Sequence, residues 1–220
     1  MRATCLLSVA VAVAALAGAA NADVVPAAAV DTATQGDWLG VYGSDGYILF
    51  SYDTTSGDRV VLPSYVSGIG VAGASRWIWD NPDPTGDVRA LQDPLSPSDR
   101  VAACIYSGGG APTVTIDCLQ TDPFRLAVYM VDWDTYDRQE LLDINGGGLS
   151  GTDTVGDFHA GKWYVYDVDP SAGATVTVAM YAVTGVNAVM SAMAFDPIPE
   201  PATLTLLALP AAALIRRRRV

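Results

Sequence analysis

Short apolar and aromatic runs alternate with clusters of Gly, Pro, Asp and Asn along most of this chain. Several runs alternate apolar and polar residues with a period of two, which is typical of half-buried strands, and no segment shows the period of an amphipathic helix. The expected strands are residues 47–52, 65–71, 76–79, 100–106, 113–119, 125–131, 140–144, 162–168, 174–182 and 188–195. Residues 24–30 are either a lead-in strand or a loose leader. The pattern predicts an all-β fold, an antiparallel β-sandwich of jelly-roll type, in a single domain over residues 23–198.

The N-terminus has the pattern of a secretory signal peptide. Arg2 precedes an uncharged apolar run over residues 6–19, and Ala20 and Ala22 are small residues at the positions that signal peptidase reads. The run is short for an uncleaved membrane anchor, which needs about 20 residues. We therefore expect residues 1–22 to form a signal helix that signal peptidase removes before Asp23.

The C-terminus combines a proline-containing triplet, an apolar segment and a terminal basic cluster. Residues 202–215 are uncharged and apolar, and they would span about 21 Å as a helix, less than a hydrocarbon core of about 30 Å. Such a segment predicts a short transmembrane helix, suited to transient anchoring, whose basic end stays in the cytoplasm. A packed C-terminal helix is the alternative, but the segment has no polar face for it. The motif residues are Pro199, Glu200, Pro201, Arg216, Arg217, Arg218 and Arg219.

Residues 199–220 resemble, over their whole length, the PEP-CTERM sorting signal of certain Gram-negative bacteria. The resemblance implies that an exosortase, a membrane-embedded, cysteine-dependent, transpeptidase-like enzyme, recognises Pro199, Glu200 and Pro201 and cleaves near them. It also implies an exported protein that is transiently anchored in the inner membrane. The protein would then be released to, or attached at, the cell surface or the extracellular exopolysaccharide matrix.

The charge distribution excludes one class of partner. The chain carries a formal charge of −12, and every acidic residue except Glu200 lies between residues 23 and 198. Binding to nucleic acid requires Lys and Arg to neutralise phosphates, so a core this acidic repels it.

A second resemblance concerns the core, over most of residues 33–196. Its motifs are similar to those of galactose-binding-like β-sandwich modules that accompany secreted bacterial glycoside-active proteins. The similar segments are residues 35–38, 42–47, 77–79, 87–91, 99–102, 132–138 and 187–189. Most of these are turn and core residues, so the resemblance implies the fold more strongly than a ligand. The pair Tyr136-Asp137 departs from the Asn-Gly type of turn that follows the Asp-Trp-Asp motif in those modules.

Two cysteines remain once the signal peptide is removed. Cys104 and Cys118 flank a Gly-rich segment, residues 107–112, that is typical of a hairpin turn. Folding about residue 111 places the two cysteines opposite each other, so we expect a cross-strand disulfide in an oxidising compartment. Two buried free thiols are the alternative.

The chain is poor in catalytic motifs. Its single histidine, His159, lies in a Gly-rich loop and is expected at the surface, and no Gly-x-Ser-x-Gly elbow is present. His and Cys ligands for zinc are lacking. We expect no catalysis, although a pair of carboxylates could in principle hydrolyse glycosides.

The most reasonable ion is a structural Ca²⁺. Asp132, Asp134 and Asp137 lie in one turn with a spacing that could supply oxygen ligands. The alternative is a solvated turn in which Arg138 offsets the charge. No other cofactor is expected.

Aromatic side chains are the best candidates for ligand contact, because glycan binding uses Trp and Tyr faces next to polar side chains. We expect Trp133, between Asp132 and Asp134, to be exposed, and Trp38 and Tyr42 are further candidates. Trp77 and Trp79 share one face of a strand. They form either core or an exposed platform, and core is favoured.

Together these features predict an exported surface or matrix protein whose sandwich associates with glycans such as exopolysaccharide, without catalysis. The alternative is a structural protein–protein or surface-layer module with no glycan affinity. A carbohydrate-active enzyme is the least favoured hypothesis.

Overall fold

The computed structural model describes residues 27–53, 57–80, 86–107, 109–120, 122–172 and 174–198. The expected signal peptide and sorting signal, with their two expected helices, lie outside these residues. Within them, no helix is long and apolar enough to span a bilayer.

The described chain is all-β, and every pairing between its strands is antiparallel, as predicted. One 3₁₀ turn, η1 (Pro170–Ala172), interrupts the strands. The strands are β1 (Ala29–Asp31), β2 (Gly46–Asp53), β3 (Gly57–Val61), β4 (Val66–Ala72), β5 (Ser75–Asp80), β6 (Leu91–Asp93), β7 (Ser96–Ser107), β8 (Thr113–Cys118), β9 (Phe124–Met130), β10 (Gln139–Gly146), β11 (Leu149–Gly156), β12 (Lys162–Val168), β13 (Thr175–Thr184), β14 (Ala188–Met190) and β15 (Ala192–Pro197).

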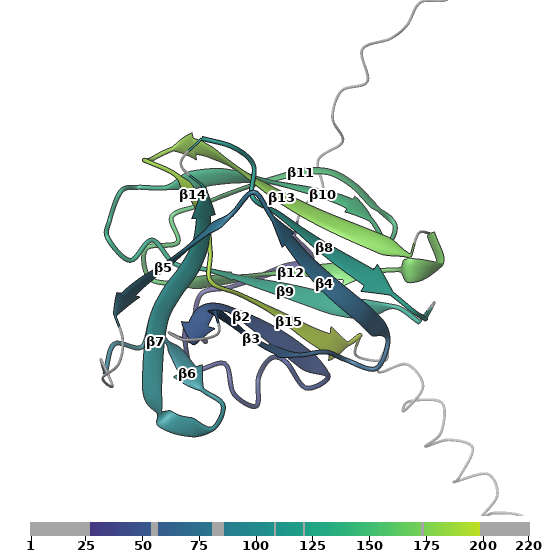
Figure 1. Cartoon of the computed structure of the whole chain (residues 1–220), viewed down its shortest axis with the longest axis horizontal. Helices are drawn as coiled ribbons and strands as arrows, with labels where there is room; N and C mark the ends of the chain where they lie inside the picture. The colour runs from purple at the N-terminus through teal and green to yellow at the C-terminus, as the bar shows by residue number, and fades with distance from the viewer. Residues whose placement is uncertain are drawn as a thin grey trace, which may run out of the picture.

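Two large sheets form the layers of the molecule (Figure 1). One has the order β1-β12-β9-β15-β2-β3, and the other has the order β11-β10-β13-β8-β4. Alternate residues of β9, such as Leu126 and Val128, are buried in one hydrophobic cluster with Val176 and Val178 of β13. This cluster is the main core, and it makes the arrangement sandwich-like.

The six-stranded sheet is also buried on its other face. The remaining residues of β9, such as Ala127 and Tyr129, pack in a second cluster with Trp38, Leu91 and Trp163. Burial on both faces explains why residues 126–130 of β9 are a continuous apolar run without alternation.

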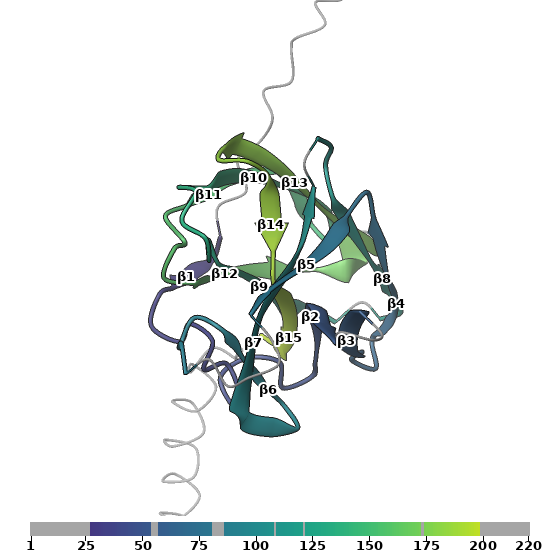
Figure 2. The same cartoon turned by 60° about the vertical axis from the view of Figure 1, so that its left-hand side comes forward.

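A third sheet, with the order β14-β7-β5, lies across the end of the sandwich that comes forward in Figure 2. Strand β6 pairs with the first half of β7. Because β7 is long, Val101 and Ala103 join the second core, whereas Cys104 and Ile105 join the main core.

The predicted hairpin and disulfide are wrong in this structure. Strands β7 and β8 belong to different sheets, and β8 pairs with β4 and β13. The segment between them therefore crosses from one sheet to another, and Cys104 and Cys118 are both buried free thiols. Burial raises the pKa of both thiols.

Most predicted strands are present, but the run at 188–195 is divided. It forms β14 and β15, in different sheets, on either side of Ser191. The Ser191 backbone N–H donates to the Tyr129 carbonyl (3.0 Å), and its carbonyl accepts from the Phe50 N–H (2.9 Å), so both groups remain paired at the crossing. Strand β1 overlaps only the end of the expected lead-in segment, residues 24–30, of which 24–26 lie outside the described residues. Strands β3, β6 and β11 were not predicted. Strand β11 is rich in Gly, Ser, Thr and Asp, and it forms through its register with β10.

Candidate functional site

The turn of residues 132–138 connects β9 to β10 and is backbone-strained. Thr135 and Asp137 have positive φ angles of 60° and 51°, a conformation that is costly for a β-branched residue. The Asp132 carboxylate holds the turn by accepting hydrogen bonds from the backbone N–H groups of Tyr136 (3.2 Å) and Arg138 (3.1 Å).

Arg138 is the polar centre of this region, and only 3% of it is exposed. Its Nη1 forms ion pairs with Asp132 and Asp134. Its Nε and Nη2 donate to Asn187 Oδ1 at 3.0 and 2.9 Å. The guanidinium therefore ties the 132–138 turn to the segment that enters β14.

A buried carboxyl group lies next to this network. Glu140 Oε1 accepts a hydrogen bond from the Val189 N–H (2.9 Å), and Oε2 has no partner among the described residues. Burial raises the pKa of Glu140 from 4.5 to about 8, although the hydrogen bond from Val189 and the charge of Arg138 oppose the shift. The group is therefore mainly protonated at pH 7, which avoids an unpaired buried charge.

An aromatic groove of about 320 Å³ opens beside the 132–138 turn. Strand β5 contributes Trp77 and Trp79 to it, β7 contributes Tyr106, and the turn contributes Tyr136. Trp77 is 53% exposed and Tyr136 is 50% exposed. The remaining lining residues are Cys104, Asp134, Arg138, Val186, Asn187 and Val189.

Polar contacts orient two of these aromatic rings. Trp79 Nε1 donates to Asp134 Oδ2 (3.1 Å), and the Arg138 guanidinium carbon lies 5.1 Å from the centre of the Tyr136 ring. The groove thus combines aromatic surface with a carboxylate and an amide held in place. This combination suits a ligand with apolar C–H faces and many hydroxyl groups.

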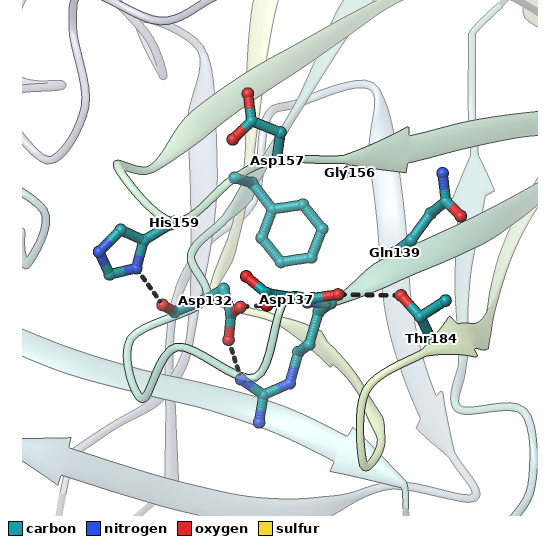
Figure 3. Close-up of a pocket in the computed structure, with 9 residues that line it drawn as sticks. Asp132, Asp137, Gln139, Gly156, Asp157, His159 and Thr184 are labelled. Carbon is teal, nitrogen blue, oxygen red and sulfur yellow. Dashed lines mark hydrogen bonds and ion pairs between the residues drawn. The ribbon is translucent and has the colours of Figure 1, made fainter.

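A second, more polar cleft of about 540 Å³ flanks the same turn (Figure 3). Its hydrogen bonds are internal to the protein. His159 Nδ1 donates to the Asp132 carbonyl (2.9 Å), and Thr184 Oγ1 donates to the Asp137 carbonyl (2.9 Å). The two contacts support the strained turn, and His159 itself is exposed, as predicted.

Two of the predicted ligand residues lie away from the groove. Trp38 is 1% exposed, its Nε1 donates to the Gln92 carbonyl (3.0 Å), and it belongs to the second core. Tyr42 is half-buried and stacks on Trp163 with ring centres 4.5 Å apart. Trp38 therefore has no surface for a ligand, and the expectation that it contacts a glycan is corrected.

Trp133 is half-buried against the second core, and the Arg89 guanidinium covers its ring at 4.4 Å. Asp132 is buried, whereas Asp134 reaches the aromatic groove. The open aromatic face belongs instead to Trp77, for which burial in the core was the favoured prediction. Trp77 and Trp79 line the same groove, as their spacing predicted.

Asp132, Asp134 and Asp137, the expected calcium ligands, do not form one group of three in this structure. Within the described residues, no three His, Cys, Asp or Glu side chains form a group that could hold a metal ion. Arg138 bridges Asp132 and Asp134, which matches the alternative in which arginine offsets the charge of the turn.

Sequence reasoning missed Tyr106 and Val186 as lining residues. The Arg138–Asn187 contact joins positions 49 residues apart. A local sequence pattern therefore cannot predict this contact. The period-two pair Trp77 and Trp79 was the available signal for the groove. The sorting residues 199–201 and 216–219, and the cleavage residues Ala20 and Ala22, lie outside the described chain.

Comparison with known proteins gives distant structural likenesses only. No family model and no curated protein sequence matches the chain. Among solved structures, the ANX2 ectodomain from Arabidopsis thaliana is similar at 10% identity and a TM-score of 0.41, covering 71% of this chain and 51% of that one. The plant receptor-like kinase ANX1 is similar at 11% identity and a TM-score of 0.39, covering 73% and 48%.

A family GH115 4-O-methyl-α-glucuronidase with specificity for decorated arabinogalactans is similar at 7% identity and a TM-score of 0.33. That match covers 57% of this chain and 18% of the enzyme. The chain thus spans about half of the receptor chains and much less of the glucuronidase. Likenesses at this level identify neither a family nor an activity.

Proposed function

We propose that this protein is an exported, non-catalytic component of the cell surface or extracellular matrix, whose jelly-roll sandwich associates with glycans through the aromatic groove. The observation that carries the proposal is the half-exposed indole of Trp77, in a groove that it shares with Trp79, Tyr106 and Tyr136.

The groove suits a sugar for physical reasons. A pyranose ring has C–H faces that pack on aromatic surfaces, and its hydroxyl groups need hydrogen-bonding partners at the rim. Asp134 supplies acceptor oxygens there and Asn187 has amide N–H donors, and Arg138 holds both side chains in place. Because these groups are already ordered, binding loses little side-chain entropy.

Affinity electrophoresis of the full-length chain in gels containing polysaccharides tests this function. The panel contains a linear β-glucan, a β-galactan, a β-mannan and the host's own exopolysaccharide. We expect retardation by at least one of them, and its loss in Trp77→Ala. Leu119→Ala is the matched control, because Leu119 is 67% exposed and does not line the groove.

Retardation that survives in Trp77→Ala would place the glycan elsewhere, with Trp133 as the next residue to test. No retardation by any polysaccharide would favour the alternative, a surface-layer or protein–protein module without glycan affinity. Parallel gels with calcium and with EDTA test whether structural Ca²⁺ contributes.

The sorting route is a separate part of the proposal, supported by the sequence of the two chain ends. Signal peptidase would remove residues 1–22, and an exosortase would act at Pro199, Glu200 and Pro201 after transient insertion in the inner membrane. Replacing these three residues by alanine should leave an uncleaved precursor in the inner-membrane fraction of the host. Unchanged release of this variant would contradict exosortase sorting without affecting the glycan proposal.

A further inference from the structure

The aromatic groove is the middle part of a longer furrow. Val186 and Asn187 also line a neighbouring hollow of about 350 Å³, which Tyr181 of β13 borders. On the opposite flank, Trp77 also lines a hollow of about 340 Å³ with Arg76. The three hollows therefore adjoin one another, because Val186 and Asn187 line both hollows on one side and Trp77 lines both on the other.

The furrow runs across strands. Trp77 lies on β5, Tyr106 on the neighbouring strand β7, and Val189 on β14, which pairs with β7 on its other side. With neighbouring strands about 4.8 Å apart, the three strands alone extend over about 10 Å, and Tyr181 lies further along on β13. This extent exceeds a single sugar ring.

The charged groups that line the furrow are already engaged by the protein. Arg138 pairs with Asp132 and Asp134, and Arg76 pairs with Asp58. Asp53, which lines the hollow beside Arg76, also has an interaction partner. The hollow beside Tyr181 has no charged side chain among its described lining residues. Among the described residues that line the furrow, a carboxylated or sulfated polymer would therefore find no cation without an ion-pair partner, and it would be repelled by the acidic chain.

We propose that the furrow binds an internal stretch of a neutral, linear polysaccharide, with several consecutive sugars in contact, and does not recognise a chain end or a single sugar. This inference rests on the proposed function, because it specifies the ligand of the same groove. Trp77 is the central stacking residue in this arrangement, and Tyr181 contacts a sugar further along the chain.

Fluorescence titration of the full-length chain with oligosaccharides of defined length tests the inference, since Trp77 is half-exposed and reports on contact. The ligands are the disaccharide and the hexasaccharide of each neutral polysaccharide in the panel, with oligogalacturonate as the anionic arm. We expect the hexasaccharide to bind at least about tenfold more tightly than the disaccharide.

Two variants test separately the outer part of the furrow at Tyr181 and its central part at Trp77. Tyr181→Ala should weaken hexasaccharide binding by about fivefold and leave disaccharide binding within about twofold, because only the longer ligand reaches it. Trp77→Ala should weaken the binding of both the hexasaccharide and the disaccharide, and Leu119→Ala should change the affinity for neither. Unchanged circular dichroism and melting temperature establish that each variant is folded.

The outcomes distinguish the two proposals. Three results would overturn this inference and leave glycan association intact. They are equal affinity for the disaccharide and the hexasaccharide, an unchanged hexasaccharide affinity in Tyr181→Ala, and tighter binding of oligogalacturonate than of the neutral ligands. Absence of binding to every ligand, polysaccharides included, would overturn the proposed function and this inference together.

Discussion

Two tryptophan-rich regions of this molecule have opposite roles. In the loop that follows β1, Trp38 is buried in the second core, and Tyr42 stacks on Trp163. On β5, Trp77 lies half-exposed in the aromatic groove. Judged from the sequence, the first region was the candidate for ligand contact and the second was the candidate for core.

The difference comes from what covers each region. Gly36 brings the loop close to the backbone before β6: its N–H donates to the Val88 carbonyl (2.7 Å), and a Cβ there would lie 2.0 Å from the Ala90 carbonyl oxygen. This close packing directs Trp38 onto the six-stranded sheet. Strand β5, in contrast, lies at the edge of its sheet with β7 as its neighbour, and no described layer covers its groove-lining face. The glycine near Trp38, Gly36, therefore reflects close packing of the loop and not an exposed binding loop.

The largest effect on stability is expected from Trp38→Ala. Removing a fully buried indole leaves a cavity beside Tyr47 and breaks the hydrogen bond to Gln92, so the free energy of unfolding should fall by about 3–5 kcal/mol. Trp77→Ala is the matched control and should cost clearly less, about 1 kcal/mol, because its indole is only half-buried. Urea denaturation measures both, and equal losses would contradict the contrast between the regions.

Arg138→Met should have the next largest effect. It leaves the buried Asp132 carboxylate without its counter-charge and releases Asn187, at an expected cost of about 3 kcal/mol. Arg125→Met is the control, because Arg125 pairs with Asp167 at the surface (3.1 Å), and exposed pairs contribute about 1 kcal/mol or less. Without Arg138, the groove residues Asp134 and Asn187 are no longer held in place. Retardation by glycans should therefore weaken in Arg138→Met and not in Arg125→Met. Similar costs for the two variants would show that Arg138 has no special role.

A smaller, pH-dependent effect is expected from Glu140→Gln. The folded protein holds the Glu140 proton up to about pH 8, whereas the unfolded chain releases it near 4.5. Its contribution to stability is therefore fully present below pH 4.5 and is lost as the pH rises from there through about 8. Between pH 6 and pH 8, the wild type should lose about 2 kcal/mol more than Glu140→Gln. Urea denaturation of both proteins across this pH range measures the difference. Parallel pH profiles would contradict the prediction, because they would show that Glu140 is already ionised in the folded protein.

Much of the architecture follows from local pattern. Alternation over residues 113–118 and 175–178, and turn residues between the runs, predicted strands that are present as β8 and β13. Period-two spacing placed Trp77 and Trp79 on one face, and composition gave the acidic, turn-rich character. These properties depend on neighbouring residues alone, because strand alternation and turn chemistry are set within a few positions.

The rest depends on which strands meet. Whether Cys104 and Cys118 face each other depends on the sheet that each strand joins, and the chain crosses between sheets after β7. Arg138 reaches Asn187, and Trp77 remains uncovered, because β14 and β5 flank β7 at the end of the sandwich. A local pattern specifies a strand and its faces, but long-range pairing selects its neighbours and so decides which face is buried.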